Sequence, residues 1–269
     1  MNKACLITLL GAVCFLSCGE KKQAEAPTED LAAKQELQGV WVNDETEDVA
    51  FRIKGDSLFF PDSMSAVQTF KVVSDTFVVT GANTSRYAIV KRTAHLFQFL
   101  NPSGEVVRLV KSTDAAYEKM FAKRAAPVNI NQGQLIKTDT VVYYDDNKYH
   151  CYVQVNPTSY KVLRASYNDD GVEVDNAYYD NIVHLAIYTG NQKLLSRDFR
   201  KDDFKKLVPA TILRQSVFSD IVFSNTAPDG IHYFAILAVP GSSTSFMVEL
   251  IISYEGKLHQ RIKEGVTVH

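Results

Sequence analysis

The segment Gly241-Ser242-Ser243-Thr244-Ser245 holds hydroxyl groups beside a glycine, the residue types from which a serine hydrolase builds its nucleophile. A nucleophile elbow has the pattern Gly-x-Ser-x-Gly and needs a strand, a sharp turn and then a helix. In this chain Ser245 stands where the second glycine belongs, and the segment lies between two expected strands. We therefore expect a hairpin loop here and no catalytic residue.

A cluster of side-chain oxygens surrounds the glycine at position 171. Its members are Asn168, Asp169, Asp170, Glu173 and Asp175. Such oxygens are ligands of calcium, but the spacing is not that of an EF-hand loop. A solvated turn is the favoured interpretation and a calcium site the alternative, so we predict no metal and no other cofactor.

The histidines are too far apart to indicate a zinc site. They occupy positions 95, 150, 184, 232, 259 and 269 and include no His-x-His or His-x-x-x-His pair. Most of them fall in expected strands, so we expect hydrogen-bonded or surface side chains.

A short apolar segment at the N-terminus ends in a cysteine between small residues. Lys3 precedes the apolar run 6–16, which is shorter than the roughly 20 residues of a membrane-spanning helix. The sequence Leu16-Ser17-Cys18-Gly19 resembles the lipobox of bacterial lipoproteins. The resemblance implies that residues 1–17 are a cleaved signal peptide and that the thiol of Cys18 carries a lipid. The alternative is an ordinary secretory signal with a chance cysteine.

Cys151 is then the one cysteine left for the folded part, because Cys5 and Cys14 belong to the expected signal peptide. No disulfide within the folded part can form, and a chain of this length needs none. The run His150-Cys151-Tyr152-Val153 is typical of a strand. We expect a buried, inert thiol, since no charged partner stands at a recognisable spacing.

The positions after Cys18 divide into a tether and a small β-domain. Residues 18–35 are mostly Lys, Glu, Gln and Ala, which predicts a flexible tether. Over residues 36–125, short alternating runs separated by turn residues predict an antiparallel meander that can close into a barrel, ending in a helix over 113–124. The expected strands are 38–43, 48–53, 56–60, 66–73, 76–80, 85–91, 94–100 and 105–111.

Residues 130–269 predict a second β-rich domain, sandwich-like and with short helices, so the fold class is mainly β. The expected strands are 140–144, 148–156, 160–167, 182–188, 193–198, 217–224, 231–239, 245–254 and 257–263. Helical turns are expected near 202–207 and 209–213, and the acidic segment 168–171 is expected to be a loop.

Gly39 and Trp41, in the sequence Leu37-Gln38-Gly39-Val40-Trp41 before the meander, resemble the opening of lipocalin-like domains. In those domains a Gly-x-Trp element begins the first strand and the indole plugs the bottom of the barrel. The resemblance covers about a quarter of the chain and implies the fold but no ligand. A core plug is the favoured role for Trp41, and a ligand platform is the alternative.

Three stretches of the C-terminal half carry a second resemblance. They are Tyr179-Asp180-Asn181, residues 199–204, and the run 234–240 that leads into 248–252. Over roughly residues 130–265 the chain resembles the domain of unknown function 4738 family, lipoproteins known mainly from Bacteroidota. The resemblance implies a lipid-anchored envelope protein, most simply in the outer membrane with its leaflet open, and brings no known activity.

Composition limits the possible partners. The formal charge of −2 gives no field that attracts nucleic acid, so we predict no nucleic-acid partner. Beyond the lipid-anchored membrane, the expected partner is an envelope protein or a glycan. Tyrosines in expected strands suit such a contact, although core packing accounts for most residues of this kind. These tyrosines are Tyr143, Tyr144, Tyr149, Tyr152, Tyr160 and Tyr167.

The leading functional hypothesis is therefore a non-enzymatic binding or assembly module. The alternative is a carrier with a small apolar ligand inside the N-terminal barrel, which requires an open cavity. An enzyme is the third possibility. The carrier hypothesis fails if the barrel is packed shut by its phenylalanines, namely Phe51, Phe59, Phe70, Phe77 and Phe97.

Overall fold

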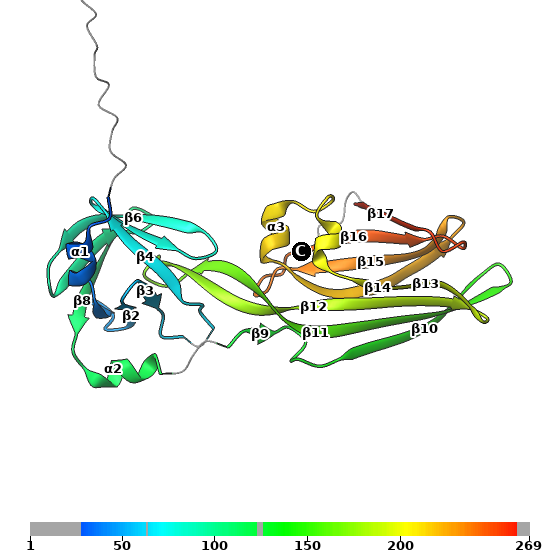
Figure 1. Cartoon of the computed structure of the whole chain (residues 1–269), viewed down its shortest axis with the longest axis horizontal. Coiled ribbons are helices and arrows are strands. Elements are labelled where there is room, and N and C mark those ends of the chain that lie inside the picture. The colour runs from blue at the N-terminus through cyan, green and yellow to red at the C-terminus, as the bar shows by residue number, and fades with distance from the viewer. Residues whose placement is uncertain (1–27, 63, 123–125, 263–269) are drawn as a thin grey trace, which may run out of the picture.

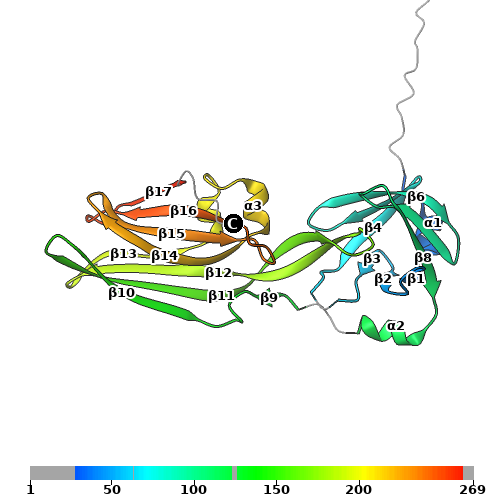
Figure 2. The ribbon, with the colours of Figure 1, turned by 180° about the vertical axis from the view of Figure 1, so that it is seen from behind.

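The fold is mainly β, as expected from the sequence. The computed structural model describes residues 28–62, 64–122 and 126–262. A closed barrel is followed by two further sheets (Figures 1 and 2). The predicted signal peptide, Cys18 and most of the predicted tether lie outside the described residues. In the described parts of the chain, no helix is long and apolar enough to cross a bilayer.

Eight strands form the barrel in sequence order, each antiparallel to the next, and the last pairs with the first to close it. Alternate positions face inward, as in the buried–exposed alternation of Gln68–Val73. The number and order of strands agree with the sequence prediction. The strands are β1 (Gly39–Asn43), β2 (Val49–Lys54), β3 (Ser57–Phe59), β4 (Gln68–Val73), β5 (Thr76–Thr80), β6 (Thr84–Arg92), β7 (Leu96–Leu100) and β8 (Val106–Ser112).

Aromatic side chains occupy the interior of the barrel. Phe51, Phe70, Phe77 and Phe97 are all buried, and the ring of Phe77 lies 5.3 Å from that of Phe97, centroid to centroid. The ring of Trp41 is also buried in this core, and its centroid lies 5.7 Å from that of Phe97. Trp41 thus has the core-plug role favoured from the sequence. A small apolar ligand inside the barrel does not fit this packing.

Phe59, one of the five phenylalanines whose packing would exclude a ligand from the barrel, does not belong to the barrel core. Its side chain is half-buried on the outer surface, where the guanidinium carbon of Arg52 lies 4.9 Å from the ring centroid. Phe59 follows the inward-facing Leu58, and successive side chains of a strand point to opposite faces.

A short helix closes the end of the barrel at which β1 begins. Helix α1 (Leu31–Glu36) begins at Asp30, whose carboxylate accepts a hydrogen bond from the backbone N–H of Ala33 at 2.8 Å. Ala33 and Leu37 are buried in the barrel core, and the indole N–H of Trp41 donates to the carbonyl of Leu37 at 2.8 Å. This corrects the end of the predicted tether 18–35, because its last residues are helical. A helix of six residues is stable here because it packs on the barrel.

Helix α2 (Ala115–Met120) follows the barrel, as predicted, and begins at the capping residue Asp114. None of its residues is buried. Glu118 forms an ion pair with Arg52 of β2, with 2.8 Å between Oε2 and Nη1. The helix therefore lies against the outer wall of the barrel.

Two antiparallel sheets form the second domain and share one hydrophobic core. Together they make the expected two-layered, sandwich-like arrangement (Figure 1). The first sheet contains β10 (Ile136–Tyr144), β11 (Asn147–Tyr167), β12 (Glu173–Thr189) and β13 (Gln192–Phe199), with β9 (Val128–Asn129) pairing parallel to β12. The second contains β14 (Val217–Ala227), β15 (Gly230–Ala238), β16 (Ser245–Ile252) and β17 (Leu258–Ile262). A 3-10 helix (Lys201–Phe204) and α3 (Ala210–Gln215) lie between the sheets in sequence.

Strands β11 and β12 are much longer than the sequence predicted. The expected strands 148–156 and 160–167 are one strand of 21 residues with an irregular register between Pro157 and Lys161. The expected strand 182–188 is the second half of a 17-residue strand that begins at Glu173. Residues 161–167 of β11 pair with residues 173–179 of β12 and form a two-stranded ribbon that extends from the sandwich to the barrel (Figures 1 and 2). The tip of this ribbon is the turn between the two strands with the first residues of β12.

Candidate functional site

The tip of the β11–β12 ribbon closes the barrel at the end opposite α1. Val172 and Val174 are buried and belong to the same core cluster as the barrel phenylalanines. The backbone N–H of Glu173 donates to the hydroxyl of Tyr87, a buried barrel residue, at 2.8 Å. The barrel core is therefore completed by residues of the following domain.

The acidic residues around position 171 dock this tip onto the barrel. Asp170 accepts a hydrogen bond from the side-chain amide of Asn43 at 2.7 Å, and Asp175 accepts one from the backbone N–H of Ala82 at 2.6 Å. Glu173 accepts from the hydroxyl of Ser85 at 2.6 Å. The predicted loop at 168–171 is confirmed, but the prediction that the cluster is solvated is wrong for these three carboxylates, which are buried.

Burial also affects the charge state of this tip. It raises the pKa of Asp170, although the hydrogen bond from Asn43 opposes the shift. Across the described part of the chain, no group of three or more His, Cys, Asp or Glu side chains is placed to hold a metal ion. The alternative calcium interpretation of the cluster gains no support.

Backbone hydrogen bonds add a second connection between barrel and ribbon. The loop between β3 and β4 pairs with β12: the N–H of Ala66 donates to the carbonyl of Asp175 at 2.7 Å, and that of Ala177 to the carbonyl of Met64 at 3.1 Å. The ribbon is therefore held to the barrel by side-chain carboxylates and by backbone hydrogen bonds, and these contacts fix the two domains to each other.

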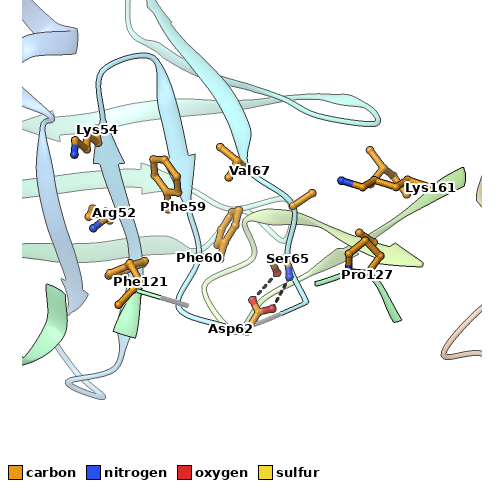
Figure 3. A pocket seen from close by; sticks show the side chains of 14 residues that line it. Arg52, Lys54, Phe59, Phe60, Asp62, Ser65, Val67, Phe121, Pro127 and Lys161 are labelled. Atoms are coloured by element: carbon orange, nitrogen blue, oxygen red, sulfur yellow. Dashed lines mark hydrogen bonds between the residues drawn. The ribbon is translucent and has the colours of Figure 1, made fainter. Parts of the chain in front are cut away.

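A pocket of about 730 Å³ lies at this junction (Figure 3). One wall is the outer surface of β2 and β3 with Phe121, and the opposite wall carries Lys161 and Leu163 of β11. The volume is within the range of about 300–1,000 Å³ that small-molecule sites occupy. Sequence reasoning missed this pocket, because its walls come from segments more than a hundred positions apart.

Arg52 is the best-held charged group of the pocket. Its guanidinium lies between two rings, with the guanidinium carbon 4.9 Å from the centroid of Phe59 and 4.8 Å from that of Phe121. Nη1 donates to Glu118, whereas Nε is buried and has no hydrogen-bond partner among the residues that the structure describes. Stacking between aromatic faces holds the planar group in one orientation.

The pocket also contains two lysines, which are unpaired among the described residues, and Asp62, which is hydrogen-bonded within its own loop. Lys54 and Lys161 form no ion pair with any residue that the structure describes. Asp62 accepts hydrogen bonds from the backbone N–H and the hydroxyl of Ser65 (Figure 3) and from the backbone N–H of Met64. The carboxylate thus shapes a loop, and the lysine charges stay available.

The serine-rich segment is a hairpin loop, as predicted. Ala238 of β15 pairs with Ser245 of β16, and the N–H of Val239 donates to the carbonyl of Thr244 at 3.0 Å. The hydroxyl of Ser242 accepts a hydrogen bond from the N–H of Thr244 at 3.0 Å. Ser242 stabilises the turn.

Sequence reasoning missed a Ser–His–Asp arrangement on the outer face of the first sheet. Nδ1 of His184 lies 2.6 Å from Asp198, and Nε2 lies 3.3 Å from the hydroxyl of Ser196. Adjacent strands at this register bring the three together. Their setting does not favour catalysis, since the Asp198 side chain is 66% exposed and a triad needs a water-excluded site.

The buried histidine His232 has a structural environment. His232 lies between two carboxylates, with Nδ1 2.9 Å from Glu249 and Nε2 2.9 Å from Asp229. This is the hydrogen-bonded histidine expected from sequence. Cys151 is buried, and burial raises the pKa of its thiol, which agrees with the expected inert cysteine.

The strand tyrosines divide between core and surface. Tyr144 and Tyr149 pack on Tyr254 between the two sheets, with ring centroids 4.6 and 5.3 Å from it. Tyr143 and Tyr152 point outward and are 63% and 40% exposed. Tyr160 and Tyr167 are also exposed, but Tyr160 lies within the irregular stretch of β11 and Tyr167 lies beyond it.

Comparison with known proteins adds one assignment to this geometry. A search of curated proteins finds no match. The model of the family described as Domain of unknown function (DUF4738) matches residues 115–259, from α2 to β17, and so begins where the barrel ends. Because this match spans more than half of the 269 residues, the chain belongs to the DUF4738 family.

Proposed function

We propose that this chain is a lipid-anchored protein of a bacterial cell envelope, of the Bacteroidota type, that binds another envelope component without catalysing a reaction. The outer face of the β10–β13 sheet carries the proposal. Val141, Tyr143 and Tyr152 all remain exposed on this face, and the rings of Tyr152 and Tyr188 pack edge to face at 6.1 Å.

Such a surface suits protein or glycan contact for physical reasons. Tyrosine offers a large rigid ring with one polar end, so it gains contact area with little loss of side-chain entropy. Polar groups lie beside the rings, including the hydrogen-bonded pair His184 and Asp198. Aromatic centres with polar neighbours are typical of binding surfaces.

The position of the barrel relative to the N-terminus supports the proposed anchoring. Glu29 bridges to Val73 beside α1, at the end of the barrel away from the ribbon tip. A lipid on Cys18 would therefore hold that end of the barrel toward the membrane. The sandwich, with its tyrosine face, would project on the other side.

The anchoring is tested by lipid labelling in the native host. Cells that express the wild-type chain or Cys18→Ser are fed a palmitate analogue, and the protein is isolated and fractionated. We expect label and membrane association in the wild type and neither in the variant. Equal labelling of both chains, or no label in either, would refute the lipid anchor.

The binding role is tested by photo-crosslinking in cells. A photoreactive residue replaces Val141, and the control carries it at Lys91 on the barrel. We expect one discrete adduct from Val141 that disappears when Tyr143→Ala and Tyr152→Ala are added, and mass spectrometry of the adduct assigns it as protein or glycan. Adducts that ignore the tyrosine changes, or that form equally at Lys91, would contradict the proposal.

A further inference from the structure

We infer that the junction pocket binds an amphipathic anion, a molecule with one carboxylate or phosphate group on an apolar body. This site is separate from the tyrosine face and does not depend on the proposed binding role. The inference rests on three features of the pocket: uncommitted positive charge, an apolar wall and sufficient volume.

The positive charge comes from both domains. Arg52 and Lys54 are two positions apart on β2, so their side chains share its outer face. Lys161 approaches from β11 on the opposite wall (Figure 3). Glu118 balances Arg52, but no acid of the described chain pairs with either lysine.

Arg52 is also built to receive an acceptor. Two aromatic rings fix its plane, and its Nε has no hydrogen-bond partner in the described residues. An orphaned buried donor costs on the order of 1–3 kcal/mol, so an orphan of this kind calls for an explanation. A small local shift that admits a carboxylate or phosphate oxygen would satisfy it.

The apolar wall separates this pocket from a simple anion site. Phe60 contributes from the barrel core, Leu163 from the ribbon, and Val67 is 55% exposed beside them. Inorganic phosphate would leave this surface in water, and a neutral hydrocarbon would leave the lysines unused. A molecule with both parts uses the whole pocket.

The test is calorimetric binding to the complete mature chain with Cys18→Ser. The probes are dodecanoate and dodecyl phosphate, which carry both parts, dodecanol, which lacks the charge, and inorganic phosphate, which lacks the apolar body. We expect a saturable 1:1 complex with at least one of the two charged amphiphiles, and the stronger of the two identifies the headgroup. Binding by dodecanol as tight as by the charged probes, tighter binding by inorganic phosphate, or no binding by either amphiphile would overturn the inference.

Variants locate the binding in this pocket. The double variant Lys54→Gln/Lys161→Gln should lower the affinity about tenfold or more, whereas Lys91→Gln/Lys137→Gln removes two exposed lysines elsewhere and should leave it unchanged. Val67→Asp places a negative charge on the exposed apolar wall and should also abolish the complex. Full affinity in the double variant and in Val67→Asp would place the complex elsewhere and refute the assignment.

Discussion

Glu249 is a buried carboxylate whose charge is held by two neighbours. It is 4% exposed, accepts a hydrogen bond from Nε of Arg261 at 2.6 Å, and lies 2.9 Å from Nδ1 of His232. Burial alone raises the pKa of a carboxyl group. Here the hydrogen bonds from Arg261 and His232 more than offset burial and bring the pKa below the ordinary 4.5.

The lowered pKa makes Glu249 a source of acid-sensitive stability. Its contribution is present above the unfolded-state pKa of about 4.5 and is lost as the pH falls through the lower folded-state value. Glu249→Gln should therefore reduce the free energy of unfolding by about 2 kcal/mol at pH 7 and flatten its decline below pH 4.5. Urea unfolding at pH 7 and at acidic pH measures both effects. The exposed Glu45→Gln is the control, and an unchanged acid slope in Glu249→Gln would disprove this role.

Single residues were predictable where their type already restricts the environment. Trp41 and Cys151 lie in the core, and His184 and His232 are hydrogen-bonded, as expected of them. The buried carboxylates of the ribbon tip were not predictable, because acidic residues around a glycine are usually solvated. Their partners Asn43, Ala82 and Ser85 lie on two strands and a turn that only the fold brings near.

At the level of elements, the close approach of the β5–β6 turn to the ribbon depends on a glycine. A Cβ atom at Gly81 would lie 1.9 Å from Oδ2 of Asp175 and 2.8 Å from Nε2 of Gln68. No real contact is that short, so a side chain there must displace the tip. The hydrogen bond from Ala82 to Asp175 would be lost with it.

Gly81→Ala should therefore undock the ribbon tip while the sandwich stays folded. We expect amide hydrogen exchange of Val172, Glu173 and Val174 to become at least tenfold faster. In the matched variant Gly190→Ala, a Cβ meets nothing within 4 Å, so only the positive φ of 52° is strained. The rate of amide exchange at the ribbon tip should therefore be unchanged in Gly190→Ala. Unchanged exchange in Gly81→Ala would show that the turn does not hold the ribbon.

The barrel strands were predictable because alternation and turn residues agree along residues 38–112. The first half of β12 was missed, since Glu173, Asp175 and Asn176 break the hydrophobic alternation that marks a strand. Glu173 and Asp175 are strand residues here because the barrel supplies their hydrogen-bond partners. Helix α1 was missed for a related reason: six residues are too few for a helix to be recognised without the surface on which it packs.

At the scale of the whole molecule, the second domain completes the core of the barrel through Val172 and Val174, so the two domains should unfold together. The protein has one tryptophan, Trp41, so its fluorescence reports on the barrel. The stacked Tyr144 and Tyr254 between the sheets report on the sandwich through near-ultraviolet circular dichroism. The two signals should follow the same urea transition in the wild type.

Val172→Asp should separate these transitions. It places a carboxylate in the barrel core and should destabilise the barrel by about 3 kcal/mol, so the tryptophan signal changes at lower urea than the tyrosine signal. Val90→Asp on the exposed surface of β6 is the matched control and should leave both midpoints together. Coincident, unshifted transitions in Val172→Asp would mean that the tip does not complete the core.

The overall fold class was predictable, but the junction was not. Alternation, turns and helix caps are local signals, whereas the pocket combines residues of β2, α2 and β11 that no local pattern connects. The expected separation at residues 125–130 also hid the ribbon, because sequence order places it wholly in the second domain. The contacts of the ribbon tip, however, place the tip in the core of the first domain.

The position of the ribbon tip also determines the order in which the two domains can finish folding. A chain that emerges N-terminus first presents all eight barrel strands and α1 long before Val172 and Val174 exist outside the machinery that makes or exports it. Until then one end of the barrel interior is open to water. The later domain thus supplies the final closing step of the earlier one, and an arrest between β8 and β12 would leave an exposed apolar mouth for chaperones or proteases to recognise.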